Sequence, residues 1–149
     1  MSALDDLLGR VVAVERGLRD GTYVRSIVED NDAWIVDMNA EGQLYEEGRN
    51  SLGVDIMDYM PYTPYTIEIK RMKGQPTDRV TLRDTGDFES SFYITTNATE
   101  FEICASDAKT AKLIKKYGRE ILGLTDENIE RLIEDYIRPG LLDKISEIL

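Results

Sequence analysis

The triplet Asp84-Thr85-Gly86 is the part of the sequence whose residue types most directly offer chemistry. A carboxylate can activate a water for hydrolysis when a second carboxylate shares its proton. The same triplet also suits the point where a strand ends and a helix begins. Asp or Thr accepts the free N–H groups of a first helical turn, and Gly permits a tight exit from the strand. The surrounding elements decide between these two roles.

Hydrolysis would require a dimeric aspartic peptidase of the retroviral type, because the chain supplies only one such triplet. The Ile-Leu-Gly stretch at 121–123 resembles the second motif of those enzymes. Two features oppose this function. No glycine-rich flap lies between the two motifs, and Arg83 beside the triplet would hold Asp84 ionised. The dimeric peptidase using catalytic Asp84 therefore stays the alternative.

The favoured interpretation of the triplet is structural, with Asp84 or Thr85 capping a short helix. Asp87 and Glu89 would then lie at the positive end of the helix dipole. On this interpretation no residue is catalytic.

A second near-motif begins at Asp37 and follows the start of a calcium-binding loop. Oxygen-bearing side chains stand at its positions 1, 3 and 5, and Gly stands at position 6. Position 12 should be a bidentate Glu and is Gly48. We therefore predict no tight calcium site over 37–48, and a turn that leads into a short helix at Leu44-Tyr45. No other cofactor is expected.

The composition excludes several classes of function. The chain of 149 residues has no His, one Cys and a net charge of −11. Without His there is no His-based nucleophile activation and no His zinc ligand. The negative charge disfavours sequence-specific nucleic-acid binding. No apolar run is long enough for a membrane span, and the acidic start is unlike a signal peptide, so we expect an intracellular chain. Cys104 is expected to be a small apolar residue in a strand.

Charge is distributed unevenly along the chain. Residues 1–60 carry 13 acids and 5 bases, residues 61–119 carry 8 acids and 10 bases, and residues 120–149 carry 8 acids and 3 bases. A basic middle between acidic ends could meet an acidic surface of a neighbour. The candidate protein-interaction residues are the basic side chains of two strips: Lys70, Arg71 and Lys73, and Lys109, Lys112, Lys115 and Lys116.

Hydrophobic periodicity predicts a single α+β domain over residues 1–149. A long N-terminal helix starts near Leu4 and runs on or breaks near 17–21. A central helix covers about 62–73, where Tyr59, Tyr62 and Tyr65 are expected as core and cap residues in preference to a stacking platform. The predicted small sheet is a β-hairpin over about 91–104, with a loop at 96–99, packed by the N-terminal, central and C-terminal helices.

The remaining elements follow from shorter signals. The apolar pattern predicts two short strands, one at residues 33–36 and one at Val80 and Leu82. Asp107 is expected to cap a helix that ends at 117, and Thr125 to cap a last helix. The Pro-Gly pair at 139–140 is expected to kink or interrupt that last helix.

Three ordered stretches give the chain a resemblance to a known family. In residues 62–74, YTPYTI is followed by the basic end of a helix, KRMKG. Residues 80–92 hold VTLRDTGDFESSF, and residues 117–127 hold YGREILGLTDE before an amphipathic tail. This order resembles the virion-morphogenesis or tail-completion (head–tail joining) proteins of tailed bacteriophages. Phe88 replaces the Leu common there, the loop after Gly118 is shorter, and the first 60 residues carry no further part of the pattern.

The resemblance implies a phage or prophage structural protein that completes the tail or joins head to tail, and not an enzyme. It further implies a homo-oligomeric ring in the virion, assembled from subunits made in the host cytoplasm. The implied partners are other phage structural proteins of portal, adaptor or tail-tube type, with no membrane partner. A net-negative ring would repel the DNA that passes through it. A generic acidic protein-interaction adaptor is a further alternative.

Overall fold

The computed structural model describes residues 2–97 and 99–149, and the fold is α+β, as predicted. The chain starts with α1 (Ala3–Arg19), whose N-terminus is closed by a capping box between Ser2 and Asp5. Gly21, with a φ of 77°, ends this helix and starts α2 (Thr22–Asp30). Tyr23 folds back so closely that its ring lies against Gly17, where no Cβ would fit. The predicted break near 17–21 is thus at Asp20-Gly21.

The apolar run at 33–36 is helical, so the predicted strand there is wrong. It lies within α3 (Asp32–Asp37), and Ile35 is fully buried. The chain continues as a π-helical stretch, η1 (Met38–Glu47), which also replaces the predicted turn before Leu44. Packing against the core overrides the local β propensity, because the buried positions in this region recur at helical spacing.

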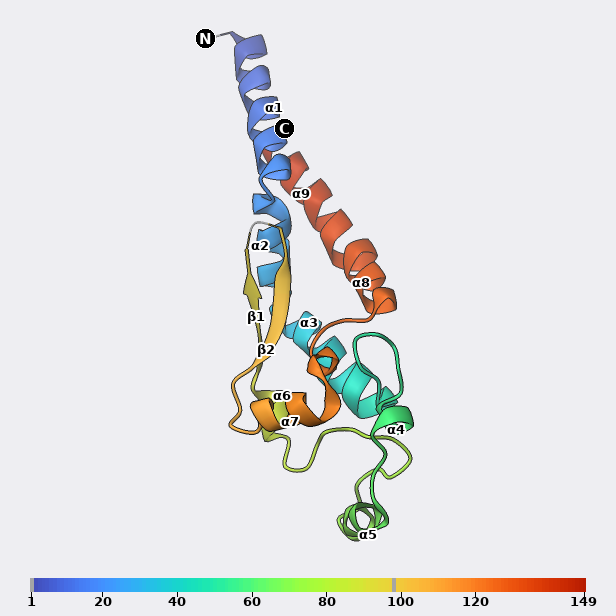
Figure 1. Cartoon of the computed structure of the whole chain (residues 1–149). Helices are drawn as coiled ribbons and strands as arrows, with labels where there is room; N and C mark the ends of the chain where they lie inside the picture. Colours follow the sequence, from blue (N-terminus) through green and yellow to red (C-terminus); the bar gives the residue numbers. More distant parts are fainter. Residues whose placement is uncertain (1, 98) are drawn as a thin grey trace.

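The middle of the chain is mostly loop and short helix. After Gly48 come α4 (Ile56–Tyr59) and α5 (Pro64–Met72), the latter capped by the hydroxyl of Thr63. The predicted central helix therefore forms, and it lies at the end of the molecule away from the hairpin (Figure 1). None of its residues is fully buried.

The three tyrosines near α5 lie in different environments. The hydroxyl of Tyr62 accepts a hydrogen bond from Thr81 N at 3.1 Å, and the hydroxyl of Tyr59 donates to Tyr117 O at 2.8 Å. Both tie the central segment to distant backbone. Tyr65 is 76% exposed, so the expectation of a core or cap role does not hold for it.

The predicted strand at Val80 and Leu82 is also wrong. These residues lie in an irregular segment, in which Val80 is buried and Leu82 has a φ of 59°. A positive φ at a leucine is incompatible with a strand. One helical turn, α6 (Asp87–Ser90), follows from Gly86.

The predicted hairpin is confirmed as β1 (Phe92–Thr96) paired antiparallel with β2 (Phe101–Ala105). Phe92 faces Ala105 and Thr96 faces Phe101 in the register. The hairpin loop includes residue 98, which lies outside the described residues. β1 packs against α2 and α3, which cover the sheet (Figure 1).

The C-terminal part consists of α7 (Thr110–Tyr117), the 3₁₀ turn η2 (Arg119–Ile121), and a long helical segment. That segment runs through α8 (Asp126–Leu132), η3 (Ile133–Ile137) and α9 (Arg138–Ile148). The hydroxyl of Thr125 caps it, as predicted. Asp107 accepts from Lys109 N in the turn before α7, and Lys109 is the N-cap.

The predicted interruption at the Pro-Gly pair does not occur. Pro139 lies in the first turn of α9, two residues after the end of the π-helical η3. A widened turn accommodates the proline ring and the missing N–H without ending the helix. Gly140 lets Ile27 of α2 approach, since a Cβ there would lie 2.9 Å from Ile27 Cδ1.

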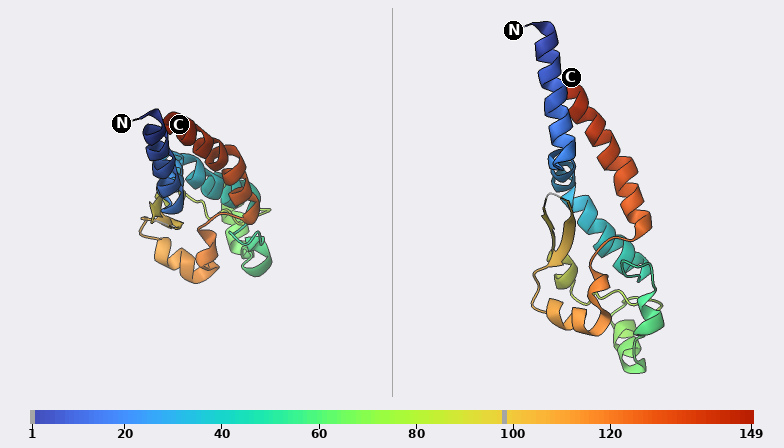
Figure 2. Two further views of the ribbon diagram at one scale, coloured as in Figure 1. Left: turned by 90° about the horizontal axis from the view of Figure 1, so that it is seen from above. Right: turned by 45° about the horizontal axis from the view of Figure 1, so that its top comes forward.

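Helix α1 and the α8–α9 segment project from the body at the same end, where both termini lie (Figures 1 and 2). Residues 3–13 of α1, here called the arm, are all exposed, and only Val14 and Gly17 of this helix are buried. The arm carries an apolar stripe formed by Leu4, Leu7, Leu8, Val11 and Val12. Within the described residues, no helix is long and apolar enough to span a bilayer.

Two buried amide side chains of η1 hold the loop before α8. Asn39 donates to Ile121 O at 3.1 Å and accepts from Gly123 N at 2.9 Å. Gln43 donates to Gly123 O at 2.8 Å and accepts from Thr125 N at 2.9 Å. The side chain of Asn128 adds a further bond to Gln43 at 2.8 Å. These bonds connect residues that lie 80 to 85 positions apart in the sequence.

We predict that Gln43→Leu lowers the free energy of unfolding by about 3 kcal/mol or more, because it leaves several buried polar groups without partners. Urea denaturation measures this change. The matched control is Glu46→Leu on the exposed side of the same helix, which should change it by no more than about 0.5 kcal/mol. Equal effects of the two substitutions would contradict the role assigned to Gln43.

Candidate functional site

The structure brings three of the seven predicted interaction residues around one cavity. This cavity, here called the basic cleft, has a volume of about 220 Å³. It lies between α5, the segment 82–89 and α7, and its basic lining residues are Lys70, Lys109 and Lys116. The two predicted strips therefore meet at this place, although about 40 residues separate them in the sequence.

The other four predicted residues lie outside the lining of the basic cleft. Arg71 is exposed on α5, and Lys112 and Lys115 are exposed on α7. Lys73 lies nearby and reaches Asp84, which does line the cleft. The lining of the cleft also includes three acids, Asp84, Asp87 and Glu89. The three ammonium groups are therefore the part of the cleft that suits contact with carboxylates of a partner.

Lys70 is the most constrained of the three lining lysines. It is half-buried, and its Nζ donates to the backbone oxygen of Arg83 at 3.2 Å and to Gln75 Oε1 at 3.4 Å. The same ammonium lies 5.0 Å from the centre of the Tyr62 ring. Lys70 therefore ties α5 to the segment that carries the Asp-Thr-Gly triplet.

Asp84 does not cap a helix, so this part of the prediction is wrong. Its carboxylate accepts from Lys73 Nζ at 2.9 Å, and the side-chain amide of Gln75 lies near both its carboxylate and its backbone oxygen. Thr85 Oγ1 accepts only a long bond of 3.4 Å from Asp87 N. The hydrogen bond from Lys73, followed by that from Gln75, holds the pKa of Asp84 below its usual range. Asp84 is thus an exposed, ionised anchor for the turn after α5.

We predict that Asp84→Asn lowers the free energy of unfolding at pH 7 by about 0–1 kcal/mol, the range for exposed ion pairs. Because the pKa of Asp84 is lowered on folding, its contribution is present above the unfolded pKa of 3.8 and is lost as the pH falls through the folded value. Urea denaturation at pH 7 and pH 3 measures this.

Lys73→Gln is the matched control for Asp84→Asn, and the double variant should lose no more than either single variant. A loss that is additive, or that persists at pH 3, would argue against a pairwise contact.

Glu89 forms the wall between the basic cleft and a second cavity of about 410 Å³. Its side chain is 4% exposed, and neither carboxylate oxygen has a hydrogen-bond partner. The nearest base is Arg83, whose Nε lies 3.9 Å from Glu89 Oε1. Burial raises the pKa of Glu89 to about 7. Glu89 does lie in the first turn of α6, as predicted, but its burial was not predicted.

Arg83 is committed elsewhere, which explains the poor pairing of Glu89. Both of its terminal nitrogens bind Glu41, at 2.6 and 3.3 Å, and its guanidinium lies 4.1 Å from the centre of the Tyr45 ring. The sequence does contain a signal for the burial of Glu89. Glu89 precedes Phe92, a core residue, by three positions, and residues at this spacing lie on the same side of a helical turn.

We predict that Glu89 makes the protein less stable as the pH rises from about 5 to 8. The folded protein binds this proton more tightly than the unfolded chain, so stability is full below the unfolded pKa of 4.5 and falls until the pH passes about 7. Relative to Glu89→Gln, the wild type should lose on the order of 2 kcal/mol over this interval.

Urea unfolding of the wild type and of Glu89→Gln at pH 5 and pH 8 measures the effect. Comparing the two proteins cancels the general repulsion within an acidic chain. Parallel pH profiles of the two would show that Glu89 does not titrate between these values.

Within residues 2–97 and 99–149, no group of three or more acidic or Cys side chains is placed to hold a metal ion. The segment 37–48 is helical for most of its length, and Asn39 within it is bonded to the backbone of Ile121 and Gly123. Comparisons with protein-family models, curated proteins and solved structures found no match to this chain.

Proposed function

We propose that this protein is a phage or prophage structural subunit that completes the tail or joins head to tail, and that it acts in a ring of identical subunits. The observation that carries the proposal is the exposed apolar stripe of the arm. The ordered resemblance of residues 62–127 to tail-completion proteins supports the same function. No chemical step is needed for this role, because it consists of contacts between surfaces.

The arm needs a partner surface for energetic reasons. Leu4, Leu8 and Val12 expose 64%, 53% and 51% of their surface. An isolated helix of this length is marginal in water, and most helical stability comes from packing of an apolar face. Fully burying one such side chain is worth about 1.5–3 kcal/mol. Docking of several together would therefore stabilise an assembly substantially.

The proposed occupant of the stripe is a neighbouring copy of the chain. Helix α1 carries three acids and three bases, so its net charge is zero in a chain of net charge −11. A second copy can approach it without the repulsion that acidic surfaces would create. The basic cleft offers a complementary contact, because its lysines can meet the acidic residues of a neighbouring subunit.

The peptidase alternative receives no support from the site. A catalytic dyad needs two carboxylates that share a proton, whereas Asp84 is bonded to Lys73 and has a lowered pKa. Peptide cleavage at acid pH that is lost in Asp84→Asn would revive this alternative. A protein-interaction adaptor would use the same surfaces, the apolar stripe and the basic cleft. It would differ from the proposed subunit in not forming a ring.

Particles from a strain that carries the gene test the proposal directly. The chain should co-purify with intact particles, and deletion of the gene should leave filled heads separate from tails, or tails without a completed end, in electron micrographs. Unchanged, infectious particles that lack the chain would contradict the proposal.

We predict that complementation with Leu4→Ser/Leu8→Ser/Val12→Ser strongly reduces incorporation, because each substitution removes apolar area from the contact. The matched control is Asp6→Ser/Arg10→Ser, which removes only an exposed ion pair of the arm. Reversing the charge of Lys109 and Lys116 should slow assembly at low salt, whereas reversing Lys112 and Lys115 should not. Quantitative immunoblotting of purified particles measures each effect.

A further inference from the structure

The outer edge of β2 is unpaired. The sheet has two strands, and β2 pairs only with β1. Two hydrogen bonds at the ends of the hairpin show which opposite residues of β1 and β2 are hydrogen-bonded to each other. They run from Ser106 N to Ser91 O at 3.2 Å and from Asn97 N to Glu100 O at 2.9 Å. Because bonded pairs alternate along an antiparallel ladder, the residues that turn their N–H and C=O groups outward are Phe101, Ile103 and Ala105.

These outward groups have no partner within the described part of the chain. None of the backbone hydrogen bonds between elements, and none of those made by side chains, involves the N–H or C=O of Phe101, Ile103 or Ala105. A row of unpaired donors and acceptors at strand spacing is a template for another extended chain.

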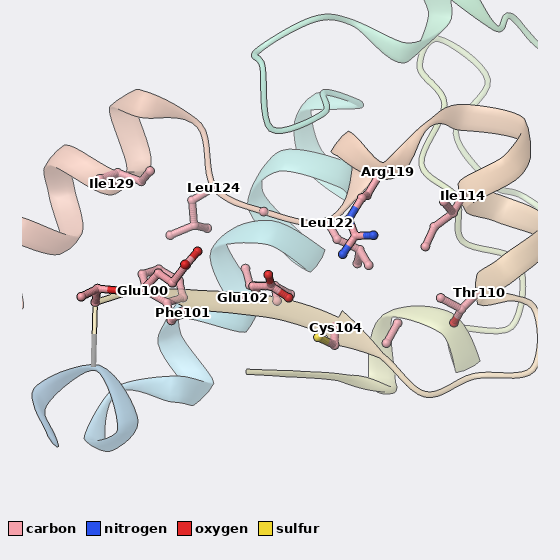
Figure 3. A pocket seen from close by; sticks show the side chains of 14 residues that line it. Glu100, Phe101, Glu102, Cys104, Thr110, Ile114, Arg119, Leu122, Leu124 and Ile129 are labelled. Atoms are coloured by element: carbon pink, nitrogen blue, oxygen red, sulfur yellow. The ribbon is translucent and has the colours of Figure 1, made fainter. Parts of the chain in front are cut away.

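A cavity of about 600 Å³ runs along this edge (Figure 3). Every residue from 99 to 105 lines it. Neighbouring side chains of a strand point to opposite faces, so a cavity over one face would be lined by alternate residues only. The lining by consecutive residues therefore places the cavity against the edge of β2.

The opposite wall comes from the C-terminal part of the chain. It is formed by Ile114 of α7, by Arg119, Leu122 and Leu124 of the following turn and loop, and by Ile129 of α8 (Figure 3). This wall lies across the cavity from β2 and is mostly apolar. The buried hydroxyl of Thr110, which has no hydrogen-bond partner within the described residues, lies toward the Cys104 end of β2 (Figure 3).

The lining defines the side chains that an added strand would carry. Phe101 and Ile103 share the face of β2 that packs on the core, and Glu100 and Glu102 share the other face. Both acids line the cavity, and neither forms an ion pair within the described residues. An incoming strand would place a base opposite Glu102 and an apolar side chain opposite Ile103.

We propose that β2 and the facing 119–129 wall bind an extended segment of a partner protein, with Lys or Arg alternating with apolar residues, as a third strand of the sheet. The segment would span about five residues, or roughly 17 Å of strand. A second copy of the hairpin is a poorer occupant, because it would bring a second Glu100 and Glu102 to a cavity that these two acids already line. The inference rests on the proposed function only in taking the partner from the same assembly.

Fluorescence anisotropy with labelled, acetylated heptapeptides tests the proposal. In the three probes, valine alternates with lysine, glutamine or glutamate. The lysine peptide should bind wild type about tenfold or more tightly than the glutamate peptide, with the glutamine peptide between them. Absence of binding of all three at millimolar concentration would overturn the proposal.

Two variants separate edge pairing from general attraction to an acidic protein. Ala105→Pro removes one outward N–H and leaves the ladder to β1 intact, so lysine-peptide binding should weaken about tenfold. Ala105→Ser keeps the N–H and should bind like wild type. Glu102→Lys should reverse the preference in favour of the glutamate peptide, whereas Glu68→Lys, on the exposed side of α5, should not.

Amide hydrogen exchange locates the bound peptide. Binding should slow exchange at Phe101, Ile103 and Ala105, and should change it little at Glu102 and Cys104, whose N–H groups already face β1. Slowed exchange only at amides outside β2 would overturn the inference, as would binding of the lysine peptide by Ala105→Pro that equals wild type. Either result would leave the proposed role in assembly unaffected. Conversely, protection at these three amides together with unaltered particles after gene deletion would contradict the proposed function and leave this site intact.

Discussion

The position of the loop from which α8 begins depends on Asn39 and Gln43, two amide side chains that are almost completely buried. Each uses both its donor and its acceptor on backbone of the loop 121–125. This loop has little regular structure, so its polar groups need partners from elsewhere once they are buried. The π-helical stretch η1 supplies those partners. A single segment in the first third of the chain therefore fixes where α8 begins and where the loop opposite β2 lies.

Local sequence signals were sufficient to predict the elements whose ends are marked by a cap, a glycine or a change of hydrophobic alternation. The Thr125 cap, the break at Gly21 and the alternation of the hairpin all involve groups within a few residues of one another. The role of Asp84 in the triplet 84–86 could not be predicted from its neighbours, because its carboxylate binds Lys73, which lies eleven residues away. Position and charge alone could not distinguish a helix cap from an ion pair.

The errors have a common physical origin in tertiary packing. The apolar run 33–36 has strand-like composition, yet Ile35 is buried as part of a helix that continues into η1. Val80 fills the core from an irregular segment, and Thr81 beside it is held by the distant Tyr62 hydroxyl. The buried Glu89 is poorly paired because Arg83 binds Glu41, which lies 42 residues before Arg83 in the sequence. None of these partners is visible in a local window. The candidate site was predictable in part, because the lysines stood out by charge, whereas the strand edge needed the fold.

The arm has a kinetic consequence. Its residues 3–13 are all exposed, and few contacts hold α1 to the rest of the described chain: Val14, the ring of Tyr23 against Gly17, the Tyr23 hydroxyl bonded to Ala13 O, and the contact with α9. Local unfolding of such a segment requires little free energy compared with global unfolding. As a helix the arm extends about 17 Å, whereas the same residues as an open chain reach roughly 36–40 Å. In the proposed assembly, an unfolded arm would therefore reach farther from its subunit than a helical arm. It would fold again only on a surface that buries its apolar stripe, so the entropy lost on folding would disfavour contacts that bury less of it.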